Sequence, residues 1–95
     1  MSENTEITIN LSYKDAALLQ HVLVNDLDYY RAGLNTLEKL KDTADPEFSN
    51  ALREAEVSPS WTRDDVDVRI KNTTKVVNVF ENVVEQIEKA IDRTV

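Results

Sequence analysis

Residues 16–40 read AALLQHVLVNDLDYYRAGLNTLEKL, a segment that contains most of the large apolar residues of the first half of the chain. Its apolar residues recur every three or four positions, which is the spacing of one face of an α-helix. No proline interrupts the chain before Pro46, and Ser12 with Asp15 forms a capping box that has Asp in the place of Glu. The sequence therefore predicts one long helix over about residues 13–41. Its main apolar stripe comprises Ala16, Leu19, Leu23, Leu27, Tyr30, Leu34 and Leu37.

A second apolar row runs beside this main stripe. It comprises Leu18, Val22, Tyr29 and Leu40, and Asp26 and Gly33 lie between the two rows. Together the rows span about half of the helix circumference. A surface of this width needs more than one neighbouring helix, because a single antiparallel partner covers only part of it. We therefore expect an interface with a second protein chain at Leu18, Val22, Asp26, Tyr29, Gly33 and Leu40.

The last third of the chain carries a similar helical pattern. Thr62 and Asp65 form a second capping box, and apolar residues at helical spacing follow it. One interpretation is a helix over residues 62–94. In the alternative, residues 66–70 form a strand, because they also alternate with period two, and the helix covers only 73–94. In both cases the two long helices are expected to pack as an antiparallel hairpin.

Two shorter elements complete the predicted fold. Asp45 followed by proline is a helix start signal, and it predicts a short middle helix over residues 46–56. Residues 5–11 alternate between apolar and polar side chains, which predicts a short N-terminal strand. Such a strand needs a partner, and residues 66–70 are the candidate within the chain. The predicted fold class is mainly α, with a single helical domain over residues 1–95.

Composition and charge exclude several classes of protein. The chain is 31% charged with a formal net charge of -7, and residues 42–67 contribute -6 of it. This balance argues against binding nucleic acid or an anionic membrane surface, both of which attract clustered Lys and Arg. The chain has no Cys and one His, His21, so thiol catalysis and zinc sites built on sulfur or several histidines are excluded. Without an apolar membrane segment or signal core, we expect a cytoplasmic protein.

No group of residues predicts an enzyme. Glu81, Glu85, Glu88 and Asp92 form an acidic ridge on the last helix, and such carboxylates can hold Mg²⁺. The ridge lies opposite the apolar stripe, however, and we interpret it as a solvated helix surface. The sequence therefore predicts no catalytic residue, no cofactor and no metal site.

The expected function is protein–protein interaction, with the chain acting as a homodimeric helix bundle. An alternative is an acidic inhibitor or regulator that docks on a basic site of a nucleic-acid-handling protein through Asp64, Asp65 and Asp67. Trp61, the only Trp, is a candidate for an exposed interaction hot spot. It can instead pack against Val66 as a hydrophobic staple at the helix start.

Overall fold

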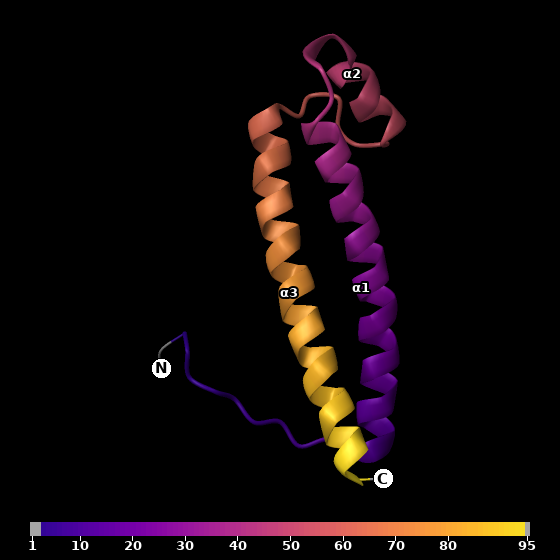
Figure 1. The fold of residues 1–95 in the computed structure, drawn as a ribbon, viewed down its shortest axis with the longest axis vertical. Coiled ribbons are helices and arrows are strands. Elements are labelled where there is room, and N and C mark those ends of the chain that lie inside the picture. Colours follow the sequence, from indigo (N-terminus) through magenta and orange to yellow (C-terminus); the bar gives the residue numbers. More distant parts are fainter. Residues whose placement is uncertain (1–2, 95) are drawn as a thin grey trace.

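A computed structural model of the chain describes residues 3–94. Its three helices are α1 (Tyr13–Lys41), α2 (Asp45–Glu54) and α3 (Arg63–Thr94). Helices α1 and α3 lie side by side and run antiparallel, and α2 lies at the end where they are connected (Figure 1). The molecule measures 55 × 30 × 17 Å. One α-helix with its side chains is about 10–12 Å across. In the stem of the hairpin only α1 and α3 lie side by side, so the stem is a single layer, one helix thick.

The capping boxes fix where both long helices begin. At α1 the hydroxyl of Ser12 accepts the N–H of Asp15 at 3.1 Å. At α3 the bonding is reciprocal, since the Thr62 N–H donates to the Asp65 carboxylate at 2.8 Å and the Asp65 N–H donates to the Thr62 hydroxyl at 3.2 Å. The prediction of one continuous helix after Thr62 is confirmed, and the alternative of a strand over residues 66–70 is wrong.

The predicted N-terminal strand is also wrong. Residues 5–11 are exposed and belong to no strand, and no strand occurs anywhere in residues 3–94. In Figure 1 this segment leaves the start of α1 as an extended chain away from both helices. A strand needs a partner for its backbone N–H and C=O groups, and the one proposed within the chain is helical instead.

The middle helix α2 is confirmed with slightly different ends. It starts one residue before the predicted range, at Asp45, and ends at Glu54. Beyond its end the Glu56 N–H donates to the Arg53 carbonyl at 3.0 Å and the Val57 N–H donates to the Leu52 carbonyl at 3.2 Å. This is the bonding of a Schellman motif. Glu56 has a φ of 59°, a left-handed conformation that usually belongs to glycine.

The best-packed part of the core lies at the connected end of the hairpin. Leu40, Leu52 and Val66 come from the three helices and are almost fully buried against one another. Along the stem, burial is confined to the line where α1 faces α3. The buried residues there are Leu27, Val77, Val84 and Ile87. Within the described residues, no helix has the length and apolar character needed to cross a membrane.

Arg63 ties the connected end together. Its guanidinium donates to the Asp45 carboxylate at 3.0 Å and to the backbone carbonyls of Lys41, at 2.8 Å, and Thr43. The same group lies over the Phe48 ring, 4.6 Å from its centroid. The carbonyls at the end of a helix have no donor within the helix itself. Arg63 of α3 supplies donors to those at and just beyond the end of α1, and through Asp45 it also binds the start of α2.

Candidate interaction surface

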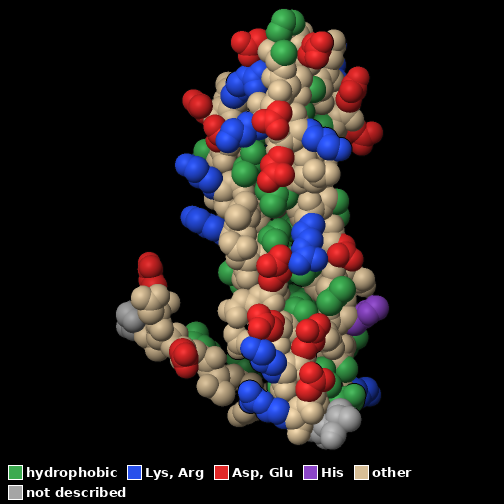
Figure 2. Space-filling view, in the orientation of Figure 1, with side chains coloured by type: hydrophobic (Ala, Val, Ile, Leu, Met, Phe, Trp, Pro, Cys, Tyr) green, Lys and Arg blue, Asp and Glu red, His purple; other side chains and the backbone are tan. Residues whose placement is uncertain are grey.

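Two contacts define the two sides of the hairpin stem. Arg31 pairs with Glu81 at 2.9 Å, and the rings of Tyr30 and Phe80 meet edge to face with centroids 5.5 Å apart. Tyr30 and Arg31 are successive residues of α1, as Phe80 and Glu81 are of α3, and successive helix residues point about 100° apart. The ion pair and the ring contact therefore lie on opposite sides of the line where the two helices touch. We call them the ion-pair side and the aromatic side. Acidic and basic side chains follow both helices down the face seen in Figure 2.

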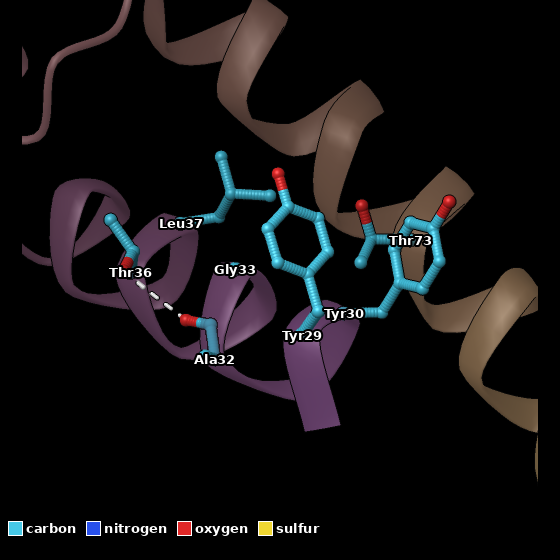
Figure 3. A pocket seen from close by; sticks show the side chains of 7 residues that line it. All are labelled: Tyr29, Tyr30, Ala32, Gly33, Thr36, Leu37 and Thr73. Carbon is cyan, nitrogen blue, oxygen red and sulfur yellow. Dashed lines mark hydrogen bonds between the residues drawn. The ribbon is translucent and has the colours of Figure 1, made fainter. Parts of the chain in front are cut away.

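The aromatic side carries an open hollow of about 350 Å³. Figure 3 shows that Tyr29 and Leu37 stand on either side of Gly33, and that Tyr30 points toward Thr73 of α3. A Cβ added to Gly33 would meet nothing within 4 Å. The chain by itself therefore does not need glycine here. The lining residues are Tyr29, Tyr30, Ala32, Gly33, Thr36, Leu37 and Thr73.

Three of the predicted interface residues form an apolar row that residues 3–94 leave largely exposed. Leu18 is 63% exposed, Val22 45% and Tyr29 75%, and we call these three the uncovered row. By helix geometry the row points away from α3, and through Tyr29 it borders the hollow on the aromatic side. Asp26 and Gly33 are exposed on the same flank of α1. The structure thus brings five of the six predicted residues to one surface.

Leu40 does not belong to this surface, which corrects the prediction for that residue. Only 3% of it is exposed, because α2 packs on the end of α1 and encloses it with Leu52 and Val66. The short middle helix therefore covers the last member of the second row and leaves the rest open.

Helix α3 contributes exposed apolar residues that the sequence analysis missed. Val79 is 58% exposed and Val68 56%. Both stand outside the apolar stripe of their helix, on the outward side. In the sequence these two residues are recognisable only as β-branched apolar residues at positions where the helical pattern predicts polar residues.

Most of the predicted acidic docking surface is engaged within the chain. Asp65 is part of the capping box of α3, and the backbone N–H and the hydroxyl of Thr62, together with the nearby charge of Arg69, lower the pKa of its carboxyl. Asp67 forms an ion pair with Lys41 at 3.2 Å. Among the described residues Asp64 alone of the three makes no such contact. Docking on a basic partner stays a prediction.

Trp61 is half-buried and not the exposed hot spot that was considered. It packs on the cluster that contains Val66, as the staple interpretation predicted. The guanidinium of Arg69 lies over the Trp61 ring, 3.9 Å from the ring centroid. Both contacts are made inside the chain, so Trp61 serves the packing at the start of α3.

The described part of the chain offers no metal centre. No group of three or more His, Asp or Glu side chains is placed to hold an ion in residues 3–94. The acidic ridge of α3 is used in surface pairs instead, since Glu85 pairs with Lys89 at 2.9 Å and Glu88 accepts from Gln20 at 3.3 Å. Comparison of the chain with protein-family models, curated proteins and solved structures finds no match.

Proposed function

We propose that this protein acts through protein–protein interaction, as a homodimer in which the uncovered rows of two hairpins pack together into a four-helix bundle. The observation that carries the proposal is the exposure of Leu18, Val22 and Tyr29 along one flank of α1. Single exposed apolar residues are ordinary on protein surfaces, whereas three along one flank of a one-layer molecule support an interaction surface.

The size of the surface suggests the strength of association. Full burial of one large apolar side chain contributes about 1.5–3 kcal/mol, and the three side chains are already partly covered. Two rows together then contribute roughly 6–10 kcal/mol. Loss of free rotation and translation opposes association by an estimated 4–15 kcal/mol. The most favourable difference between these two ranges is about 6 kcal/mol, which corresponds to a dissociation constant of tens of micromolar, so we expect a dimer no tighter than that.

Gly33 provides a second, independent argument for the same surface. Glycine inside a helix costs about 1 kcal/mol relative to alanine, and no atom of the described residues would lie within 4 Å of a Cβ added to Gly33. A side chain of the second copy seated in the hollow beside Tyr29 accounts for that cost. Gly33→Ala should therefore raise the thermal stability of the dilute monomer and weaken dimerisation.

Sedimentation equilibrium between about 1 and 100 μM tests the proposal. Val22→Asp places a charge in the uncovered row and should weaken dimerisation at least tenfold. Asn35→Asp is the matched control, because it adds the same charge at an exposed position on the ion-pair side of α1. A wild-type chain that stays monomeric throughout this range overturns the proposal, and so does equal weakening by both variants.

A further inference from the structure

The outward face of α3, which points away from α1, carries a stripe of basic side chains. Val84 marks the side of α3 that is buried against α1, and at about 100° per residue the stripe lies roughly 140–180° around the helix from it. The stripe is about 33 Å long at 1.5 Å per residue. In Figure 2, basic side chains project from the left edge of the stem, the edge that α3 forms. Four exposed residues make up this basic stripe: Lys71, Lys75, Lys89 and Arg93.

The acidic residues of the same stretch lie on another side of the helix. Glu81, Glu85, Glu88 and Asp92 are about 40–100° around from Val84, toward the ion-pair side. Within residues 3–94 only Lys89 of the basic stripe forms an ion pair, with Glu85 at 2.9 Å. The helix therefore separates its charges, and it leaves unpaired positive charge on the outward face of a chain whose net charge is -7.

Two exposed valines share the outward face with the basic stripe. Val68 is 56% exposed and Val79 58%. They are eleven residues apart, which is three turns or about 17 Å, so they point in nearly the same direction. Lys71 and Lys75 lie between them. The other residues of the face are exposed amides, which add uncharged hydrogen-bond donors and acceptors: Asn72, Asn78, Asn82 and Gln86.

This combination of groups favours an acidic helix over a nucleic acid as the ligand. Phosphates make no apolar contact with the two valines, and a long polyanion is repelled by the net negative charge of the chain and by the acids beside the stripe. A helix with carboxylates along one narrow side and apolar residues among them matches the face in charge and in apolar contact.

We infer that the outward face of α3 binds an acidic amphipathic helix of another protein. The carboxylates of the partner contact Lys71 and Lys75, and its apolar side chains contact Val68 and Val79. This face lies on the side of α3 that is remote from α1, so it stays open when the uncovered rows of two copies pack together. Binding of the acidic helix therefore does not depend on the proposed homodimer.

Fluorescence anisotropy with a labelled synthetic peptide tests this binding. The peptide is a helix of about 24 residues, long enough to match the stripe, with glutamates along one side and two leucines eleven residues apart among them. A second peptide of the same composition, with its glutamates spread around the helix, is the control probe. The wild type should bind the patterned peptide with a dissociation constant of about 100 μM or below, and at least tenfold more tightly than the control peptide.

Three double variants locate the binding on the outward face. Lys71→Gln with Lys75→Gln should weaken binding of the patterned peptide at least threefold in 50 mM NaCl and less in 0.5 M NaCl, because salt screens exposed charges. Val68→Ser with Val79→Ser should weaken it at least threefold at both salt concentrations. Lys39→Gln with Arg53→Gln is the matched control, since it removes two exposed positive charges from the other helices, and it should bind within twofold of the wild type. Circular dichroism checks that every variant keeps its helix content.

Each contrary result overturns the inference. Equal binding of the two peptides, unchanged binding by either of the first two variants, or no binding of the patterned peptide does so. Equally tight binding of a single-stranded DNA of the same net charge also does so, because the face would then attract any polyanion. In sedimentation equilibrium the lysine variant should dimerise like the wild type, and loss of dimerisation would assign this face to a contact between copies. A wild-type chain that is monomeric but binds the patterned peptide overturns the proposed homodimer alone.

Discussion

Replacing Arg63 by alanine should destabilise the connected end of the hairpin, although 36% of the side chain is exposed. Its guanidinium bonds the carbonyls of Lys41 and Thr43, pairs with Asp45 and lies over Phe48. We count about 1 kcal/mol for each carbonyl bond, in the usual range for a net hydrogen bond. The exposed pair with Asp45 adds about 0–1 kcal/mol and the ring contact about 0.5–1 kcal/mol. The expected loss is about 2.5–4 kcal/mol.

Urea unfolding followed by circular dichroism measures this loss, at one protein concentration for all variants because dimerisation would add to the apparent stability. Arg53→Ala is the control, since Arg53 is an exposed arginine at the end of α2 whose side chain makes no ion pair with the described residues. Arg63→Lys should recover less than half of the loss, because an ammonium lacks the planar fork that reaches two carbonyls and a carboxylate. If the free energies of unfolding of Arg63→Ala and Arg53→Ala differ by less than about 0.5 kcal/mol, which is on the order of the error of such measurements, the assigned role of Arg63 is refuted.

Three further changes test other parts of the fold. Glu56→Gly should stabilise the protein by about 0.5–1 kcal/mol in the same unfolding assay, because glycine adopts the φ of 59° without strain. Leu52→Ala should cost about 2.5–4 kcal/mol, since only 1% of Leu52 is exposed. The lowered pKa of Asp65 means that its contribution is present above the pKa of the unfolded chain and is lost as the pH falls through the folded value. The stability difference between the wild type and Asp65→Asn should therefore shrink below about pH 4.

The long helices could be predicted from the sequence because local signals and the apolar pattern agreed. The capping boxes at Ser12 and Thr62 and the helical spacing that follows each of them point to the same boundaries. Residues 66–70 fitted two patterns at once, and the contact that decides between them is not local. Val66 is completely buried against Leu40 and Leu52, a packing that the helix permits and the sequence does not display.

The N-terminal segment shows the limit of periodicity as a signal. Alternation in residues 5–11 describes side chains that suit a strand, but a strand exists only when a second one is available to it. The same limit applies to Leu40, because its place in the second row was correct and the helix that covers it could not be positioned from the sequence. Arg63 carried no signal at all, since its role depends on the backbone path of three elements.

The two ends of the hairpin differ in how far the chain can cover its own apolar surface. At the connected end three helices converge, and Leu52 and Val66 are almost fully enclosed. Along the stem only the line between α1 and α3 is covered, although the apolar residues of α1 occupy about half of its circumference. Helix α2 has 10 residues and α1 has 29, so at 1.5 Å per residue they extend about 15 and 44 Å. A helix of that length can extend along only about a third of α1, and Leu40 is the one member of the second row that it covers. In the proposed dimer, the second copy supplies the remaining length with a helix equal to α1 itself.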